Sequence, residues 1–459
     1  FRQGVDDYRG LTPPVPSDYR RWLLRNEPML SAADVAARLA ALPRKPRLSV
    51  VMPVYQAPER WLRRALDSVV AQHYPDWELC ICDDASPSPH VRSVLEEYQR
   101  RDPRIKVVYR RENGHISVSS NSALEVATGE YMVLLDHDDE LHPDALLLVA
   151  ETACRVPDAR LIYSDEDKID EDGNRFDPYF KPDWNYDLFL GQNCISHLGV
   201  YSLPLVRELG GFRKGLEGSQ DWDLALRCVE RIAPGQIVHI PRVLYHWRAI
   251  QGSTALAAGE KNYAVVAGRR AVEEHLQRTG QAGEVSILPA SMMRVKRPVP
   301  VPAPKVSLVI PTRDRVDLLR LCVDSILERS SYPDYEILVV DNGSVEQETL
   351  DYFERISAMP DVRVLPYPGE FNYSAINNFA VAQARGEVIG LVNNDIEVIS
   401  PDWMEEMVSH AMRPDVGAVG AMLYYPDETI QHAGVLVGLC GVAGHVGSRH
   451  PRGSEGYFG

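Results

Sequence analysis

Cysteine and long apolar runs are scarce in this sequence of 459 residues. Its seven cysteines are scattered, and the one close pair, Cys80 and Cys82, falls on one face of a predicted strand, where it cannot surround a metal ion. This pattern is typical of reduced core cysteines and favours a cytoplasmic protein. No segment approaches the roughly 20 apolar residues of a membrane-spanning helix, and the first residues lack a signal-peptide pattern. Because the sequence begins without Met and ends in GSEGYFG, we expect a piece of a longer protein.

Positive charge is also in short supply, since 49 lysines and arginines stand against 65 aspartates and glutamates. The formal net charge is −16 and the sequence pI is about 5.3, which disfavours nucleic acid as a partner. An acidic protein that binds an anionic substrate needs a local device for it, such as a metal ion. The balance of 45% hydrophobic and 25% charged residues is that of an ordinary folded protein with room for at least two cores.

Two copies of one pattern make up most of the sequence. Pro53 stands 30 residues before Asp83, and Pro311 stands 30 residues before Asp341, within stretches that match in order. The aspartate of a later acidic motif also repeats, 55 residues after Asp83 and 54 residues after Asp341. Such agreement predicts two homologous domains. The predicted organisation is a helical segment (1–45), a first domain (46–295), a Pro-rich linker (296–304) and a second, incomplete domain (305–459).

Each copy alternates between buried strand and amphipathic helix. SVVMPVY and WELCICDD are apolar β-rich runs, and WLRRALDSVVAQ between them has apolar residues at helical spacing. A strand–helix–strand pattern with crossovers this long predicts an α/β fold with a mostly parallel sheet covered on both faces. Ligands of such sheets bind beyond the carboxyl ends of the strands, where PVY, CDDAS and DHDD all fall. The opening segment is expected to form one or two helices without chemistry.

The most acidic of these strand ends is YMVLLDHDDEL. Acids after a strand often cap the next helix, and Asp139 or Asp144 could do so. A calcium loop requires glycine at its sixth position, where Leu141 stands, and a phosphatase-like nucleophile belongs nearer the first strand. Asp136 and Asp138 can converge where the strand ends, and there they could hold a divalent cation, Mg²⁺ or Mn²⁺, that neutralises a diphosphate.

Five motifs in order resemble those of the family 2 glycosyltransferases with the GT-A fold: MPVYQAPERWLRRALDSVVAQ, CDDAS, NGHISVSSNSALEVATGEYMVLLDHDDEL, GGFRKGLEGSQDWDLALR and LYHWRAIQGSTA. They extend over about 210 residues of the first domain. The resemblance implies two tandem GT-A domains and an inverting transfer of a sugar from a nucleotide-diphosphate sugar to an acceptor hydroxyl. The tandem arrangement resembles bacterial enzymes that build O-antigen and related surface glycans, often with rhamnose.

The resemblance assigns the donor site residue by residue. Asp83 matches the acid that binds the nucleobase, with Asp84 beside it; a turn-forming role for Asp83 is the alternative. Asp136 contacts the ribose or a water on the metal, and Asp138 matches the metal ligand of the family's Asp-x-Asp. The other donor-binding residues expected in the first domain are Pro53, Tyr55, Asn113, Gly114 and His137.

Asp221 in GSQDWDLALR is the predicted catalytic base, although Gln220 stands where the family has another acid. A carboxylate at the acceptor hydroxyl can take its proton as the oxygen attacks the anomeric carbon. The alternative is that Asp221 only caps the following helix. Trp222 is expected to pack under the acceptor sugar.

The remaining motifs supply further candidates. His246 in LYHWR is a possible ligand for a transition ion such as Mn²⁺, with a buried hydrogen-bonded histidine as the alternative. Arg248 and Ser253 are expected to close over the diphosphate, since the arginine side chain is a planar fork of donors. The acids of YSDEDKIDEDG are expected in a solvated turn or lining the sugar pocket, together with Lys181.

The second copy keeps only part of this set. Its acidic strand end reads NND, so that Asn393 replaces Asp136 while Asp395 keeps the metal position. No counterpart of GSQDWDLALR or LYHWR follows, and a binding module for glycan or partner is the alternative for this domain. Its predicted donor-binding residues are Pro311, Thr312, Asp341, Asn393 and Asn394.

Two other enzyme classes compete with the transferase. A nucleotidyltransferase that makes the activated sugar would show a Gly-rich loop after its first strand, whereas MPVYQAPERW has no glycine. A dinucleotide-dependent dehydrogenase is disfavoured because no G-x-G-x-x-G follows either first strand. We expect a glycan or lipid-linked glycan acceptor, a cytoplasmic location and possible peripheral association with the inner face of the cytoplasmic membrane; the donor sugar, its base and the oligomeric state are left open.

Overall fold

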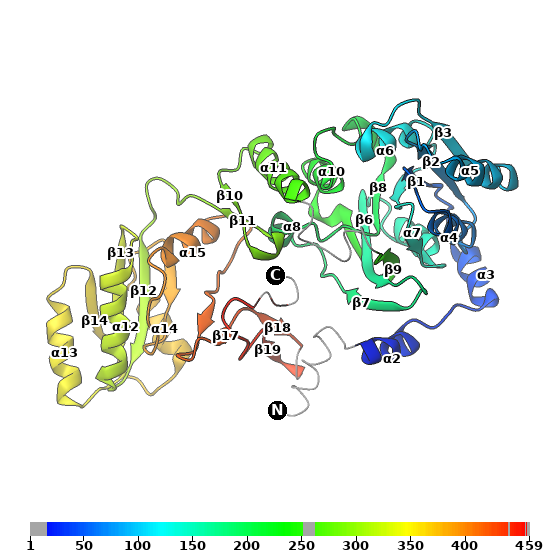
Figure 1. The fold of residues 1–459 in the computed structure, drawn as a ribbon. Coiled ribbons are helices and arrows are strands. Elements are labelled where there is room, and N and C mark those ends of the chain that lie inside the picture. The colour runs from blue at the N-terminus through cyan, green and yellow to red at the C-terminus, as the bar shows by residue number, and fades with distance from the viewer. Residues whose placement is uncertain (1–15, 251–261, 439–440, 455, 457–459) are drawn as a thin grey trace. The chain divides into compact units, whose positions relative to one another are not determined.

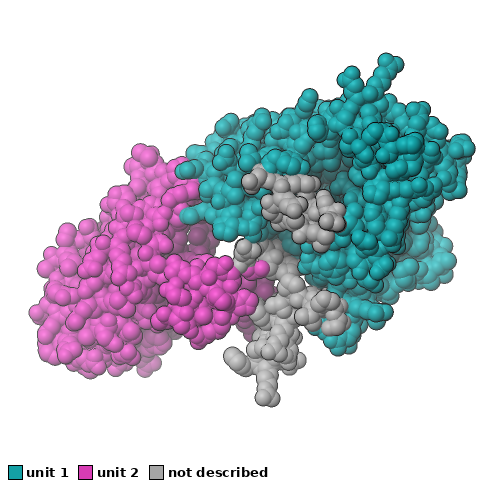
Figure 2. All heavy atoms as spheres, in the orientation of Figure 1, with its two compact units in different colours: residues 1–295, 457–459 teal, residues 296–456 magenta. Residues whose placement is uncertain are grey.

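The computed structural model describes residues 16–250, 262–438, 441–454 and 456. It divides into two compact units, Phe1–Val295 with Tyr457–Gly459 as unit 1 and Lys296–Gly456 as unit 2 (Figure 2). Both units alternate strands with helices, and the predicted α/β class is confirmed (Figure 1). None of the described helices combines the length and apolar character that crossing a bilayer requires.

Among the described residues, unit 1 starts with two helices. Its strands and helices then alternate along the chain, and most of the strands form the main sheet. Its elements are α2 (Pro16–Asn26), α3 (Ala32–Ala41), β1 (Leu48–Val54), α4 (Glu59–Val70), β2 (Trp77–Asp83), α5 (Pro89–Arg101), β3 (Ile105–Tyr109), α6 (His115–Glu125), β4 (Tyr131–Leu134), β5 (Glu140–Leu141), α7 (Ala145–Arg155), β6 (Leu161–Ile169), β7 (Arg175–Tyr179), α8 (Tyr186–Gly191), β8 (Gly199–Ser202), α9 (Leu203–Glu208), α10 (Gln220–Val229), the 3-10 turn Pro234–Gln236, β9 (Ile237–Arg248), α11 (Asn262–Arg278), β10 (Glu284–Ile287), the 3-10 turn Pro289–Ser291 and β11 (Met293–Lys296).

The main sheet of unit 1 has two halves. Its strand order is β3-β2-β1-β4-β8-β6-β9-β5, with β7 beside β6, among the described residues. β3, β2, β1 and β4 run parallel, whereas β8 is antiparallel to both β4 and β6. Because β8 runs against β4, its first residues meet the carboxyl end of β4. This meeting point carries the candidate site.

Both faces of this sheet are covered. Leu48, Val50 and Met52 of β1 pack with α4, α5 and α7, while Val51 points to the opposite core with α6, α9 and α10. This division follows from the period of two along a strand. The cysteines of the described ranges are free thiols, and all but Cys154 are buried.

Unit 2 repeats the parallel half of unit 1. Among the described residues its main sheet has the order β14-β13-β12-β15, with all pairs parallel, and two small antiparallel sheets follow. Residues 297–305, which include most of the predicted linker, form neither helix nor strand. The elements are β12 (Val306–Thr312), α12 (Val316–Arg329), β13 (Tyr335–Asp341), α13 (Gln347–Ser357), β14 (Val362–Pro366), α14 (Tyr373–Val381), β15 (Val388–Leu391), α15 (Trp403–Ala411), β16 (Leu423–Tyr424), β17 (Ile430–His432), β18 (Val435–Val437) and β19 (Ala443–His445).

Candidate active site

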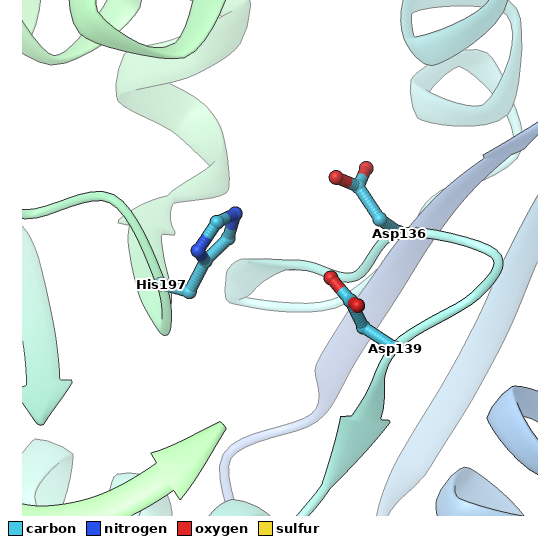
Figure 3. A group of neighbouring side chains, drawn as sticks. All are labelled: Asp136, Asp139 and His197. Carbon is cyan, nitrogen blue, oxygen red and sulfur yellow. The ribbon is translucent and has the colours of Figure 1, made fainter. Parts of the chain in front are cut away.

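The acidic loop, residues 135–139 between β4 and β5, faces the residues that precede β8. Ligand atoms of Asp136, Asp139 and His197 all lie within 4.8 Å of one another. Figure 3 shows both carboxylates and one ring nitrogen of His197 directed toward a common point. Two carboxylates and an imidazole are suitable donors for Mn²⁺, so this group fits a divalent cation.

Asp139 is the best-anchored acid of the loop. One of its oxygens accepts a hydrogen bond from the Tyr245 hydroxyl at 2.5 Å, and the other accepts from the backbone N–H of Arg248 at 2.7 Å. Burial raises the pKa of this carboxyl well above its ordinary value, and the neighbouring Asp138 and Asp136 raise it further. Asp139 therefore shapes the loop by tying it to β9.

Asp136 and Asp138 are held differently. The Asp136 N–H donates to the Tyr245 hydroxyl at 3.3 Å, and the Asp138 carbonyl accepts from Arg248 Nε at 2.7 Å, so both are fixed through their backbone. Within the described part of the chain, no side chain hydrogen bonds to either carboxylate. Burial raises the pKa of Asp136, while His197 opposes that rise. These two acids remain available to an incoming ligand.

His197 faces the acidic loop from the residues that precede β8. Its Nδ1 lies 3.4 Å from Glu166, which also accepts the His197 N–H at 3.0 Å, and its ring stacks on Tyr245 with centroids 4.4 Å apart. Burial disfavours the charged ring, but Glu166, Asp139 and Asp136 outweigh it and raise the pKa of His197 to about 9. Glu166 and the two acids of the loop therefore surround this ring with negative charge.

A buried lysine holds the segment that carries His197. Lys181 Nζ donates to Glu166 at 3.0 Å and to the Ile195 carbonyl at 2.8 Å, and it also hydrogen bonds the His197 carbonyl. Its side chain is fully buried. The prediction that Lys181 lines the sugar pocket is therefore corrected, because its ammonium group is enclosed by these partners.

Asp221 lies in the first turn of α10 and interacts electrostatically with His197 and Asp136. Its Oδ2 accepts a hydrogen bond from the Asn193 amide at 2.7 Å, and Asn193 Oδ1 in turn accepts from the Ser196 N–H at 3.2 Å. Burial raises the pKa of Asp221, whereas His197, backbone N–H groups and Asn193 oppose that rise. Asn193 and Ser196 thus connect the predicted base to the segment that carries His197, which faces the acidic loop.

The predicted nucleobase pocket lies where β1 and β2 end. Asp83 and Asp84 are buried, and Asp83 accepts the Ser86 N–H at 3.1 Å, as in the turn-forming alternative. Asp84 accepts the Gly114 N–H at 3.0 Å and pairs with Arg110 at 2.8 Å.

The other predicted donor residues border the same strand ends. Tyr55 is exposed, and the Pro53 carbonyl lies 3.3 Å from His137 Nδ1. Asn113 donates to the Asp84 carbonyl at 3.3 Å. The structure therefore brings these residues to one strand edge, where their donor-binding role stays a prediction.

Two predicted site residues are placed elsewhere. Trp222 is 5% exposed, and its indole N–H donates to the Phe189 carbonyl at 3.0 Å, so it belongs to the core and not to an acceptor platform. Arg248 is fully buried over the Trp61 ring and pairs with Glu140, so it does not reach over a diphosphate. Both predictions are corrected by long-range packing. Ser253 lies outside the described residues.

His246 is separated from the acidic loop. Its Nδ1 lies 2.6 Å from Asp167, and its ring meets His142 edge-on at 6.0 Å. Tyr245 contacts the loop, and consecutive side chains of a strand point to opposite faces, so His246 points away from it. The predicted metal pair of Asp138 and His246 is therefore not the one that the fold assembles.

The first three acids after Tyr163 are not in a solvated turn, whereas Asp170, Glu171 and Asp172 follow β6 in a hydrogen-bonded turn at the surface. Asp165, Glu166 and Asp167 belong to β6, which pairs with β9, and all three are buried. Each has a basic partner, and Arg175 pairs with Asp167 at 2.5 Å. The prediction of a turn is wrong for Asp165, Glu166 and Asp167, because strand pairing with β9 and the partners His239, Lys181 and Arg175 enclose them.

His197 and Asn193 were missed by the sequence reasoning, and Glu166 was named only among the acids of YSDEDKIDEDG. The available signal is the polar stretch GQNCISH immediately before an apolar strand. It becomes informative only when β8 is known to run antiparallel to β4, because the start of β8 then lies at the carboxyl edge.

Unit 2 presents the counterpart positions on a more open surface. Asp341 accepts the Ser344 N–H at 2.8 Å, and Asn394 donates to Thr312 Oγ1 at 3.0 Å. Asn393 and Asp395 are exposed. Pro311 is half-buried at the end of β12. The described residues of unit 2 hold no counterpart of α10 and Asp221.

Comparison with protein families agrees with this geometry. The family model described as glycosyl transferase family 2 matches residues 49–210 and again residues 307–435. The chain belongs to this family. Both matched segments start at the first strand of a unit, so the internal repeat is a repeat of the glycosyltransferase domain.

Two relatives of this glycosyltransferase extend over nearly all of its sequence. An uncharacterised protein y4gI of Sinorhizobium fredii is 53% identical over 92% of this chain and 47% of its own length. The O-antigen biosynthesis protein RfbC of Myxococcus xanthus is 41% identical over 96% of this chain and 34% of its own length. The chain thus spans less than half the length of both relatives.

Solved structures give only slight likenesses. TarS of S. aureus, residues 1–349 with UDP-GlcNAc, has a TM-score of 0.43 and 18% identity over 50% of this chain and 66% of that one. The mannosyltransferase PcManGT of Pyrobaculum calidifontis, with GDP-Man and Mn²⁺, has a TM-score of 0.38 and 18% identity over 61% of this chain and 75% of that one. At these TM-scores the likenesses support no assignment of residues or ligands.

Proposed function

We propose that unit 1 is an inverting, divalent-cation-dependent glycosyltransferase that moves a sugar from a nucleotide-diphosphate sugar to an acceptor hydroxyl. The observation that carries the proposal is that the acidic loop, His197 and Asp221 lie close enough to interact electrostatically. A donor needs charge neutralisation at its diphosphate and a base at the acceptor. The acidic loop offers residues for the first task, and Asp221 offers one for the second.

The donor end is assigned to the acidic loop and the strand ends beside it. Asp136 and Asp138 would hold Mg²⁺ or Mn²⁺, because their carboxylates have no side-chain partner among the described residues. When bound, the cation supplies positive charge to the diphosphate leaving group. Tyr55 follows the end of β1, and Asp83 is the last residue of β2. Both border the place assigned to the nucleobase.

The acceptor end is assigned to Asp221. Its carboxylate would take the proton of the attacking hydroxyl, and attack opposite the diphosphate inverts the anomeric carbon. Asn193 donates to one carboxylate oxygen and thereby fixes the direction of the group. A pKa above that of an ordinary aspartate makes Asp221 a stronger base.

Bacterial surface-polysaccharide synthesis is the proposed setting. Its support is the sequence likeness to RfbC, whose name states O-antigen biosynthesis. A glycan or lipid-linked glycan at the inner face of the membrane is the proposed acceptor. Unit 2 is proposed to bind a donor nucleotide or glycan through the strand ends that it shares with unit 1.

The proposal is tested by incubating the chain with UDP-, GDP- and dTDP-sugars and Mn²⁺ or Mg²⁺, with and without oligosaccharide acceptors. Release of nucleoside diphosphate is measured, and the anomeric configuration of the product is read by NMR. We expect one donor class to turn over with inversion, and EDTA to stop the reaction. Release of pyrophosphate from a sugar phosphate and a nucleoside triphosphate would instead support a nucleotidyltransferase.

A further inference from the structure

The outer side of α2 carries an excess of positive charge. The helix holds three arginines against one acid, Asp18, in a chain whose formal net charge is −16. The arginines are Arg20, Arg21 and Arg25, and all three are exposed. Arg21 pairs with Asp18, whereas Arg20 and Arg25 have no hydrogen-bond or ion-pair partner among the described residues. This part of an acidic protein is therefore locally basic.

The same helix and the segment after it expose two large apolar side chains. Leu24 is 78% exposed and Met29 is 72% exposed, the highest values for large apolar side chains in the described part of unit 1. Leu24 lies one helical turn after Arg20 and Arg21, so the three side chains are neighbours on the helix surface. Together with Arg25 they form the basic side of α2.

The opposite side of α2 is fixed to the sheet. Tyr19 is fully buried, and its hydroxyl donates to Asp167 of β6 at 2.7 Å. Trp22 packs against Phe180, with ring centroids 4.6 Å apart. Figure 1 shows α2 next to β7 at the margin of unit 1. Because these contacts hold the helix, its basic side is presented in a fixed orientation.

We propose that the basic side of α2, together with Met29, docks unit 1 on a membrane surface that contains anionic phospholipids. Arginines are attracted to the lipid phosphates, while Leu24 and Met29 supply the apolar side chains that enter the boundary of the acyl chains. The acidic remainder of the chain is repelled by such a surface, so the basic side also sets the orientation of the docked protein. The inference goes beyond the proposed function, because it concerns a surface and not the site of transfer.

α11 of unit 1 is a contrast that isolates the charge. Its Val266 is 51% exposed, so this helix also presents an apolar side chain to solvent. The two arginines that follow, Arg269 and Arg270, each pair with a glutamate one turn later. Apolar exposure on α11 is thus combined with paired arginines, and the helix provides matched control variants.

The test is flotation of the full chain with vesicles of phosphatidylcholine alone or with about 30% phosphatidylglycerol, in which the bound fraction is measured. We expect binding to the anionic vesicles only, and a decrease of that binding as the salt concentration rises. Arg20→Gln with Arg25→Gln should weaken partition about 25-fold, because each arginine near an anionic membrane contributes about fivefold. The matched pair Arg269→Gln with Arg270→Gln should stay within about twofold of the unmodified chain.

The apolar side chains distinguish a membrane from an acidic polymer as the partner. Leu24→Ser with Met29→Ser is expected to weaken partition about tenfold, whereas Val266→Ser should leave it unchanged. Salt-dependent binding that the paired serine variant leaves unchanged would indicate an acidic polymer and overturn the inference. Equal partition into neutral and anionic vesicles, or binding to neither, would overturn it as well.

A depth measurement locates the contact directly. We expect a nitroxide on Leu24→Cys to become accessible to oxygen and shielded from a nickel chelate on anionic vesicles, while one on Val266→Cys keeps its aqueous accessibility. The chain without either substitution, treated with the same label, gives the background from its own cysteines. Circular dichroism reports whether each variant is folded. Equal accessibility of the two labels on anionic vesicles contradicts the docking surface.

Failure of the inference and failure of the proposed function are distinguishable. A chain that transfers sugar but does not bind anionic vesicles keeps the function and overturns the docking surface. A chain that binds these vesicles through α2 but turns over no nucleotide sugar contradicts the function and keeps the docking surface.

Discussion

Unit 1 and unit 2 start with the same four strands, and their pairing agrees almost residue for residue. Leu48 pairs with Trp77 on β2, and Val306 pairs with Tyr335 on β13. A buried serine and glutamate repeat as well: Ser49 donates to Glu78 at 2.7 Å in unit 1, and Ser307 donates to Glu336 at 2.7 Å in unit 2. The frame of the sheet is thus the same in both copies.

The copies differ in the groups at the strand ends. Asp84 pairs with Arg110 in unit 1, whereas Asn342 and Tyr367 occupy these places in unit 2. β4 is covered by the antiparallel β8, while the described residues of unit 2 add no strand beyond β15, where Leu391 is 56% exposed. The two units therefore share the pairing of their strands but not the charged residues at the strand ends.

Loss of the base in unit 1 should have the largest effect. Asp221→Asn is expected to reduce sugar transfer about a thousandfold, because general-base catalysis is removed, while Mn²⁺ binding is retained. The matched Asp395→Asn variant of unit 2 should transfer at the unmodified rate. Transfer is measured as nucleoside diphosphate release with the nucleotide sugar that turns over in the test of the proposed function. Equal rates for Asp221→Asn and the unmodified chain would remove Asp221 from the mechanism.

Removal of the amide that orients the base should have an intermediate effect. Asn193→Ala is expected to lower kcat up to about a hundredfold with little change in the KM of the donor, since the geometry of Asp221 is relaxed. Loss of the Asn193 hydrogen bond also raises the pKa of Asp221, so the acid limb of the pH–rate profile should move to higher pH.

The groups that face Asp221 in that profile are His197, Asp136 and Tyr201. Asn185→Ala is the control, because Asn185 caps α8 by accepting the Leu188 N–H and does not touch the site. A parallel loss of kcat in both variants would indicate a general structural effect and contradict the positioning role of Asn193.

The buried glutamate of the sheet can be replaced in either unit, and we expect a similar loss of stability in both. Glu78→Gln is expected to destabilise unit 1 by about 2 kcal/mol, because it weakens bonds from Lys106, Ser49 and Thr128 to a buried carboxylate. Glu336→Gln should destabilise unit 2 by a similar amount. Hydrogen exchange with mass spectrometry, which separates the peptides of the two units, is the measurement.

The stabilisation that Glu78 gives to unit 1 depends on pH. Burial opposes the ionisation of Glu78, but the bonds from Lys106, Thr128 and Ser49 outweigh it and lower the pKa to about 2. The stabilisation is therefore present above the ordinary glutamate pKa and is lost as the pH falls toward about 2. Protection of β1 and β2 that is unchanged by Glu78→Gln at neutral pH would contradict this account.

The smallest effect is expected where the copies differ. Asp84→Asn should destabilise unit 1 by about 1 kcal/mol, because Arg110, a quarter exposed, loses its partner. Asn342→Asp should destabilise unit 2 by a similar amount, since Tyr367 offers the new carboxylate no cation. Urea unfolding followed by fluorescence measures both, and a gain in stability from Asn342→Asp would show that unit 2 neutralises the charge in another way.

Much of the parallel half of each unit was predictable from the sequence. Its strands and helices have clear periods, and the repeat served as an internal control for their spacing. The carboxyl ends of parallel strands meet at one edge, so Asp83, Asp136 and Asp138 could be placed there before the structure was known. These conclusions depend on local patterns and on a general property of parallel sheets.

The antiparallel half was not predictable in the same way. Whether Trp222 faces an acceptor or the core, which face of β9 carries His246, and what Arg248 contacts all depend on strand direction and on partners far away in the sequence. Local periodicity contains no information on such contacts. The sequence by itself therefore determined the two-copy frame and its family, whereas only the tertiary structure decided that His197, Asp136 and Asp221 lie close together, because β8 runs antiparallel to β4.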